Sequence, residues 1–254
     1  MEAKLISQIR CPAAPSSRQV CKQRCRPVYA VLARPAENLR LKLKPADNKA
    51  ATSVYNDNWF DLLAINYLSQ SVQAATGVKS MLSGYDGLVE TAAMVSKKFD
   101  TKTQQELVIQ ALDRAIPKLI LDMIRTLLPQ SQFTREYFAA FTTVFFAWLM
   151  GPSEVRESEL KGRREKNVVY VKKCRFLEQS SCVGMCTNLC KIPSQTFIKD
   201  ALGMPVSMVP NFDDMSCEMI FGQDPPAPSD DPALNQPCYK LCRANQMHTV
   251  KSSG

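Results

Sequence analysis

The stretch 174-CRFLEQSSCVGMCTNLC-190 and its continuation 191-KIPSQTFIKDALGMPVSMVPNFDDMSC-217 contain five of the ten cysteines in this chain of 254 residues. At ordinary usage, about one or two cysteines would be expected in that length. Thiols clustered in this way are usually disulfides or metal ligands. We therefore expect this stretch to organise the second half of the fold and to carry the chemistry.

A strand is predicted immediately before this stretch, where the run Val168–Val171 is β-branched and aromatic. Residues 205–211 (PVSMVPN) and 215–222 (MSCEMIFG) predict a second pair of strands, joined by the turn signal NFDD. Between the first strand and this pair, residues 194–203 predict a short helix that ends at Gly203. The second half is therefore predicted to be a small mixed α/β unit.

The first half has the periodicity of helices from Tyr55 onward. In the first predicted helix, Asn56 or Asp57 is the N-cap and Gly77 is the stop. The second predicted helix places four apolar residues on one face: Leu88, Ala92, Val95 and Phe99.

Two further helices follow in the same half. Thr103 and Glu106 have the spacing of a capping box at the start of a third helix. Pro117 and Pro129 bracket a fourth, which is short and strongly apolar.

The most apolar helix is predicted over residues 133–150, closed by Gly151. Its uninterrupted apolar part is shorter than the roughly 20 residues that cross a bilayer, and Arg135 and Glu136 lie at its start. Two interpretations remain for this helix, the central core helix or a surface that meets a large apolar ligand. Both hold if the wall of a pocket is also part of the core.

The charged run 153–166 (SEVRESELKGRREK) is interpreted as a solvated connector between the halves. The fold class predicted is α+β, with about five helices followed by a cysteine-rich α/β unit and disordered termini. We expect five segments: a transit peptide at 1–33, a linker at 34–53, a helical half at 54–152, a cysteine-rich half at 153–242 and a tail at 243–254.

The net charge of +8 belongs to the N-terminus. Residues 1–49 hold eleven Lys and Arg against three acidic residues, so the remaining 21 basic and 21 acidic residues cancel. A neutral body argues against nucleic-acid binding. Residues 1–33 are rich in Arg, Ser and Ala without a long apolar run, which favours an organelle transit peptide over a secretory signal, with a disordered basic tail as the alternative. Cys11, Cys21 and Cys25 would be removed with this segment.

The spacing Cys182-x3-Cys186-x3-Cys190 limits what these thiols can bind together. In one straight helix the outer two would lie about 12 Å apart along the axis, too far for one ion with Zn–S bonds of about 2.3 Å. Either the segment bends, with Gly184 as the candidate, or only a subset binds. A cluster relaxes the constraint, and Cys₄ ligation of an iron–sulfur cluster is the natural case.

Three readings of the thiols remain open on spacing alone: a metal site, buried or redox-active thiols, and packing. The only histidine, His248, lies in a polar tail, so a histidine-rich metal site or a Ser/His/Asp arrangement is not available. The candidate metal ligands are Cys174, Cys182, Cys186, Cys190 and Cys217, with Glu218 either as an oxygen ligand or as an ordinary strand carboxylate.

Four longer stretches carry a family resemblance: 59-WFDLLAINYLS-69, 135-REYFAAFTTVFFAWLMGPSEVRESE-159, 162-GRREKNVVYVKKCRFLEQSSCVGMCTNLCKIPSQTFIKD-200 and 210-PNFDDMSCEMIFGQDPPAPSDDPALNQPCY-239. Together they resemble the iron-containing β-carotene isomerase family of plant plastids, the dwarf-mutant proteins of strigolactone biosynthesis. The resemblance implies an enzyme that interconverts all-trans- and 9-cis-β-carotene, the first committed step toward carlactone. It also implies a chloroplast location and bound iron, as a non-haem ion or an iron–sulfur cluster.

A C40 hydrocarbon would require a long apolar binding surface. The candidate substrate-binding residues are Leu119, Ile120, Ile124, Leu127, Phe138, Phe141, Phe145 and Trp148. The expected partners are β-carotene and, at its surface, the plastid membrane, with carotenoid-cleaving enzymes connected by the pathway only. The alternatives are a non-catalytic iron–sulfur or redox protein, a structural zinc protein, and a relative that isomerises a different carotenoid bond.

Overall fold

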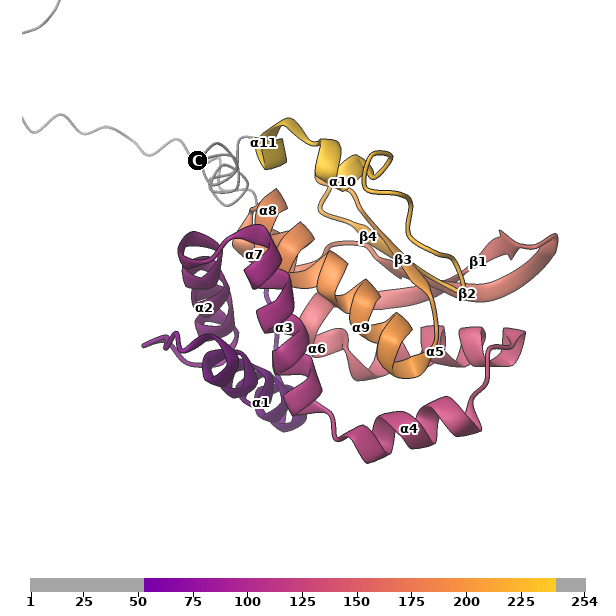
Figure 1. Ribbon diagram of the computed structural model, residues 1–254, viewed down its shortest axis with the longest axis horizontal. Helices are drawn as coiled ribbons and strands as arrows, with labels where there is room; N and C mark the ends of the chain where they lie inside the picture. The colour runs from indigo at the N-terminus through magenta and orange to yellow at the C-terminus, as the bar shows by residue number, and fades with distance from the viewer. Residues whose placement is uncertain (1–52, 241–254) are drawn as a thin grey trace, which may run out of the picture. The chain divides into compact units, whose positions relative to one another are not determined.

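The computed structural model describes residues 53–240, and Figure 1 shows a helical first part followed by a sheet with its own helices. This arrangement confirms the predicted α+β class. The expected transit peptide, nearly all of the linker, Cys242, His248 and the tail lie outside the described residues.

The first three helices are α1 (Trp59–Thr76), α2 (Gly84–Lys98) and α3 (Thr101–Ala115). Gly77 ends α1 in the left-handed conformation, as predicted. The predicted N-caps are wrong, because Asn58 caps α1 in a capping box with Asp61. Likewise, Asp100 rather than Thr103 caps α3.

Proline and glycine delimit the next helices as expected. Helix α4 (Lys118–Leu127) lies between Pro117 and Pro129. The predicted helix 133–150 is divided into α5 (Gln132–Phe145) and α6 (Ala147–Met150), with Phe146 at the break and Gly151 at the end. No helix within residues 53–240 is both long and apolar enough to cross a membrane.

The charged run 153–166 is not a connector, so this prediction was wrong. It forms β1 (Ser153–Leu160) and the start of β2 (Arg163–Val171), an antiparallel hairpin. Lys161 and Gly162 have φ of 53° and 76°, as a two-residue hairpin turn requires. β1 lies at the edge of the sheet and is largely exposed, so charged side chains are compatible with it and hide its strand pattern.

The four strands form one antiparallel sheet in the order β1-β2-β4-β3. The predicted strand pair is present as β3 (Val206–Pro210) and β4 (Cys217–Phe221). The predicted helix before Gly203 is present as α9 (Ile192–Leu202). Gln195 on α9 accepts a hydrogen bond from Met208 N at 2.7 Å, which protects the outer edge of β3.

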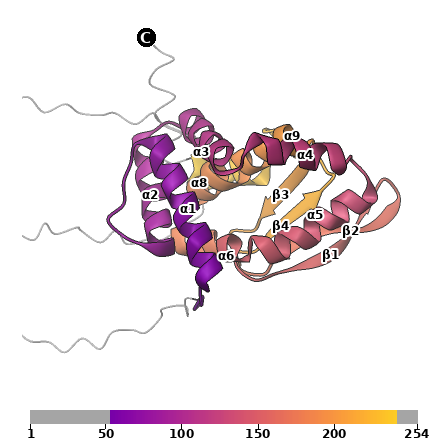
Figure 2. The ribbon, with the colours of Figure 1, turned by 90° about the horizontal axis from the view of Figure 1, so that it is seen from below.

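The main core joins the helical part to the sheet. Phe138 on α5 stacks on Phe221 of β4 at 6.1 Å between ring centroids, and both belong to one cluster with Val169, Val171 and Met219. In Figure 2 α5 runs along the sheet, whereas α1 and α2 lie beyond one end of the sheet. A second cluster contains Ile65, Tyr85, Leu88 and Trp148.

Candidate functional site: a buried group of thiols

Two of the predicted thiols are brought together by the sheet. β4 begins at Cys217, which pairs with Val171 at the end of β2. The chain leaves β2 toward Cys174, whose N–H donates to Met215 O at 2.7 Å just before β4. Cys174 and Cys217 therefore sit at adjacent strand ends, although the sequence separates them by most of the cysteine-rich stretch.

The other three predicted thiols lie on a nearly continuous helical segment. Cys174 leads into α7 (Arg175–Ser180), and Cys182 precedes α8 (Val183–Met185). A π-helix then runs over Cys186–Lys191 and continues into α9. Gly184 lies inside α8, so the segment does not bend there; it widens at Cys186 instead. Such i→i+5 turns are rare and are frequent at functional sites.

Four thiols interact electrostatically inside the core. Burial, followed by the neighbouring thiols of Cys190, Cys217 and Cys174, raises the pKa of Cys186 well above its ordinary value. Burial and Cys174 raise the pKa of Cys190 to about 12. Burial, followed by the thiols of Cys174 and Cys190, raises the pKa of Cys217, and burial raises the pKa of Cys174. In the absence of a bound cation these four groups are neutral thiols at neutral pH.

A buried chain of polar side chains holds the π-helix in place. Tyr239 donates through its hydroxyl to Asn188 Oδ1 at 2.9 Å, and Asn188 Nδ2 donates to Gln104 Oε1 at 3.4 Å. Gln104 Nε2 donates in turn to Phe99 O at 2.7 Å. Because Gln104 and Asn188 are at most 1% exposed, leaving either without a partner would be costly. These hydrogen bonds fix the π-helix that carries Cys186 and Cys190 relative to α3 and to α11 (Pro237–Lys240).

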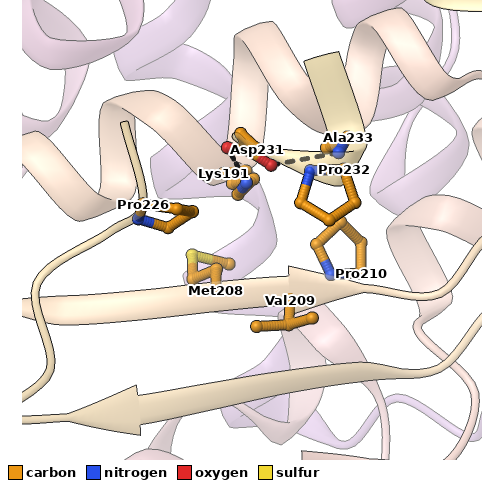
Figure 3. Close-up of a pocket in the computed structure, with 8 residues that line it drawn as sticks. All are labelled: Lys191, Met208, Val209, Pro210, Pro226, Asp231, Pro232 and Ala233. Carbon is orange, nitrogen blue, oxygen red and sulfur yellow. Dashed lines mark hydrogen bonds and ion pairs between the residues drawn. The ribbon is translucent and has the colours of Figure 1, made fainter. Parts of the chain in front are cut away.

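The last residue of the π-helix is a lysine that is almost fully buried. Lys191 forms an ion pair with Asp231, which also caps α10 (Pro232–Asn235) by accepting from Ala233 N. Figure 3 shows these side chains pointing toward one another beside a cavity of about 30 Å³ near Met208. That volume is suited to about one water molecule, so the cavity is not a carotenoid site.

A second charged group lies at the other end of the thiol segment. Arg175 forms two hydrogen bonds with Asp57, at 2.5 and 2.8 Å. Its guanidinium also lies over the rings of Tyr85 and Tyr55, at 3.8 and 4.6 Å from the centroids. These contacts fix the turn after Cys174 against α2 and the segment before α1.

The six cysteines within residues 53–240 are all free of disulfides. Across those residues, no three Cys, His, Asp or Glu side chains are grouped so that they could hold a metal ion. Glu218 pairs across the sheet with Tyr170 and Val209, and strand alternation places it on the opposite face of β4 from Cys217. The thiol donors are of a type that suits iron, whereas their arrangement does not form a ligand set.

The predicted substrate-binding residues are divided between core and surface. Phe138 and Trp148 are buried, and Ile124 packs against the main core. The other five are exposed on α4 and α5: Leu119, Ile120, Leu127, Phe141 and Phe145. They do not line the two cavities described here.

The larger cavity is an open groove of about 580 Å³ between α2 and the α7–α8 segment. Val89, Ala93 and Met185 supply its apolar lining, but Asp86, Glu90 and Glu178 also border it. Its mixed lining differs from the long apolar binding surface expected for a C40 hydrocarbon.

Comparisons with known proteins show the family of this chain. The family model described as "Beta-carotene isomerase D27-like, C-terminal" matches residues 148–230. The Medicago truncatula protein named "Beta-carotene isomerase D27, chloroplastic" is 59% identical over 255 residues, covering 99% of each chain. This chain belongs to the β-carotene isomerase D27 family. The Arabidopsis thaliana protein of the same name is 53% identical over 219 residues, 83% of each chain.

No solved structure matches this D27 family member. The segment matched by the D27-like family model begins at Trp148 and includes the hairpin, the five candidate thiols and Glu218. It ends one residue before Asp231, so Lys191 falls inside the matched segment and its partner outside it.

Several residues that position the thiols in this D27 family member were missed from the sequence: Asp57, Gln104, Arg175, Asn188, Lys191 and Asp231. Only Arg175 and Lys191 carried a local signal, because they are the two basic residues within the cysteine-rich stretch 174–191. The partners lie far away in sequence and have no distinguishing local pattern.

Proposed function

We propose that this chain interconverts all-trans- and 9-cis-β-carotene inside the plastid. The observation that carries the proposal is the 59% identity, over 99% of both chains, with the Medicago truncatula protein named "Beta-carotene isomerase D27, chloroplastic". The chloroplastic designation of both relatives supports the location. Enzymes that cleave 9-cis-carotenoids would then consume the product.

The described residues suit a reaction of this kind. Cis–trans isomerisation of a polyene adds and removes no atoms, so it requires temporary loss of double-bond order rather than an acid–base pair. Residues 53–240 contain no histidine. What they offer is a group of thiols inside an apolar core, with Phe176, Met185 and Met204 among its neighbours. An environment of this kind excludes water and protects reactive intermediates.

Iron bound by these thiols remains a prediction. The predicted donors are Cys174, Cys186, Cys190 and Cys217, the four thiols of the core that influence one another's pKa, although the described residues do not group three of them as a ligand set. Iron would supply one-electron exchange or Lewis-acid polarisation of the polyene. The protein would keep water away from the thiols and limit their motion.

The test uses the full chain purified without oxygen and incubated with all-trans-β-carotene in detergent micelles. Chromatography is expected to show 9-cis-β-carotene, and the reverse reaction from the 9-cis isomer is expected as well. Metal analysis and visible absorption measure iron independently of activity. A Cys186→Ser/Cys190→Ser variant is expected to lose iron and at least about 90% of the rate, as losses at metal sites commonly do.

Cys238 provides the matched control because it is an exposed thiol in the same chain. The Cys238→Ser variant is expected to keep both iron and activity. If iron-loaded wild-type protein forms no cis product, the isomerase proposal is wrong. If the double variant isomerises β-carotene as fast as the wild type, the thiols are not part of the reaction.

A further inference from the structure

A ladder of exposed aromatic rings runs along α5. Phe133, Tyr137, Phe141 and Phe145 recur at every fourth position, and successive ring centroids lie 6.3, 6.2 and 4.9 Å apart. The rings are nearly parallel, at 22°, 17° and 16°. Each side chain is between 39% and 68% exposed. Twelve residue steps at 1.5 Å each extend the ladder over about 18 Å.

The aromatic strip continues onto α1. Phe145 contacts Phe60 at 5.6 Å between centroids, and Phe60 contacts Trp59 at 6.1 Å. Trp59 is 78% exposed. In Figure 2 α1, α4 and α5 are all on the side that faces the viewer. We define the apolar face by ten of the exposed apolar residues of these helices: Trp59, Leu63, Leu119, Met123, Leu127, Phe133, Tyr137, Phe141, Val144 and Phe145.

These side chains are not needed for the core. The opposite side of α5 already supplies Phe138, Ala139 and Thr142 to the interior. On α4 only Leu121 is buried, and Leu119 on the exposed side is 84% exposed. Exposed aromatic and aliphatic side chains gathered on helices that face the same side are typical of a binding site. The ladder faces away from the core that holds the thiols, so it is not a surface that brings a polyene to them directly.

Positive charge lies beside one end of the ladder. Residues 159–166, at the tip of the β1–β2 hairpin, contain four basic residues, Lys161, Arg163, Arg164 and Lys166, and two acidic ones. One of these acids, Glu165, is buried and forms two hydrogen bonds of 2.6 Å with Arg135 of α5. The adjacent backbone N–H of Lys166 donates to Glu136 Oε1 at 3.1 Å. The basic tip is therefore attached to the N-terminal end of α5, next to Phe133.

We propose that the apolar face and the basic tip form a docking surface for a lipid bilayer with anionic headgroups. This inference rests on the proposed function, since β-carotene is a hydrocarbon that dissolves in bilayers. Exposed Trp, Tyr and Phe rings insert at the headgroup boundary, and neighbouring Lys and Arg bind anionic lipids. The sequence analysis predicted four residues of this surface as substrate-binding, Leu119, Leu127, Phe141 and Phe145, but did not connect them with the hairpin tip from a different part of the chain.

The experiment measures co-flotation of the full chain with vesicles of phosphatidylcholine, with and without phosphatidylglycerol. Wild-type protein is expected to bind, and more tightly when phosphatidylglycerol is present. A Met123→Glu/Phe133→Glu variant is expected to bind at least about tenfold more weakly. Inserting one large apolar side chain into the bilayer contributes a free energy equivalent to about a tenfold change in affinity. Arg163→Gln/Arg164→Gln is expected to weaken binding about tenfold at low salt and less at high salt.

Matched controls use exposed residues outside the surface. Met81→Glu replaces a side chain that is 97% exposed in the α1–α2 connection, and Lys199→Gln removes an exposed cation on α9. Both are expected to bind like the wild type. The chain contains only two tryptophans, and Trp148 is buried. Brominated lipids are therefore expected to quench fluorescence in the wild type but not in Trp59→Phe.

Three results would overturn the docking surface. The first is wild-type protein that does not float with either vesicle. The second is a Met123→Glu/Phe133→Glu variant that binds as well as Met81→Glu, which would mean that another part of the chain covers the face or makes the contact. The third is a stable dimer that this variant dissolves while vesicle binding is unchanged. The micelle assay is independent of bilayers, so its failure would remove the proposed function and leave the vesicle result standing.

Discussion

Lys191 and Asp231 form an ion pair whose side chains are only 2% and 6% exposed. Removing one partner of such a pair leaves an uncompensated buried charge, which typically costs about 3–5 kcal/mol. We therefore expect Asp231→Asn to lower the free energy of unfolding by about that amount in urea titrations. Replacing both partners by apolar residues, in Lys191→Met/Asp231→Leu, should recover part of the loss.

The pair between Lys199 and Asp224 is the matched control for this prediction. It has the same Lys–Asp chemistry, but its side chains are 57% and 69% exposed. Exposed pairs contribute little, so Lys199→Met should leave the midpoint of unfolding nearly unchanged. Equal effects of Asp231→Asn and Lys199→Met would show that the buried pair does not stabilise the segment after the π-helix.

Replacing Arg175 by lysine should destabilise the fold. The two hydrogen bonds to Asp57 and the contacts with two tyrosine rings use the planar shape of the guanidinium. Arg175→Lys is expected to lower the free energy of unfolding by about 1.5–3 kcal/mol, the range for hydrogen bonds to charged groups. Arg156→Lys is the comparison, because Arg156 also lies over a ring but is 45% exposed. A loss below about 1 kcal/mol is expected there, and a similar loss at both positions would contradict the argument.

Gly222 is required by space as well as by backbone conformation. Its φ is 90°, and a Cβ there would lie 2.1 Å from Cδ of Arg135 and 2.9 Å from Cδ2 of Leu160. Gly203 has a φ of 68°, but the nearest atom to its Cβ would be 3.6 Å away. Gly203→Ala should cost about 1–2 kcal/mol from conformation alone, and Gly222→Ala about 1–3 kcal/mol more. Thermal unfolding measures the difference, and the reverse order would refute it.

Glu178 should make stability depend on acidity. Burial opposes its ionisation, but Lys173, the Ser53 N–H and the Tyr55 hydroxyl outweigh burial and lower its pKa to about 2. Because the folded pKa lies below the unfolded value of about 4.3, this stabilisation is present above about pH 4.3 and is lost as the pH falls toward about 2. Melting temperature should therefore decline over that range less steeply in Glu178→Gln than in the wild type. Glu106→Gln, at an exposed site, should keep the wild-type slope.

The sequence predicted elements whose signals are local. Gly77, Pro117 and Gly203 delimit helices where expected, because a left-handed φ or a missing N–H acts on the adjacent residues alone. The predicted N-cap of α1 was wrong because Asn56, Asp57 and Asn58 are all residue types that cap helices, and the choice depends on where Asp61 can return a hydrogen bond. The hairpin was missed because β1 lies at an exposed edge, where charged residues replace the apolar alternation of a strand.

The candidate site was predicted in part. The choice of Cys174 and Cys217 placed two thiols that the β2–β4 pairing does bring to adjacent strand ends. The widening of the helix at Cys186 has no local signal in the sequence, and Asn188 within it contacts Gln104 and Tyr239 from distant elements. The ligand assignment itself remains a prediction. Charge and ring pairs such as Arg175–Tyr85 also join positions far apart in sequence, which single-sequence patterns do not connect.

The hydrogen bond from Cys174 N to Met215 O, beside the Val171–Cys217 pair, has a consequence for biogenesis. Cys174 and Cys217 become neighbours only after segments more than forty residues apart have joined in the sheet, a late event for a chain whose helices form locally. In a newly made or newly imported chain these two thiols are therefore apart, and each alone would bind a metal only weakly. Any metal delivered to it would have to wait for the inner strands to pair, so cofactor loading would report on completed folding.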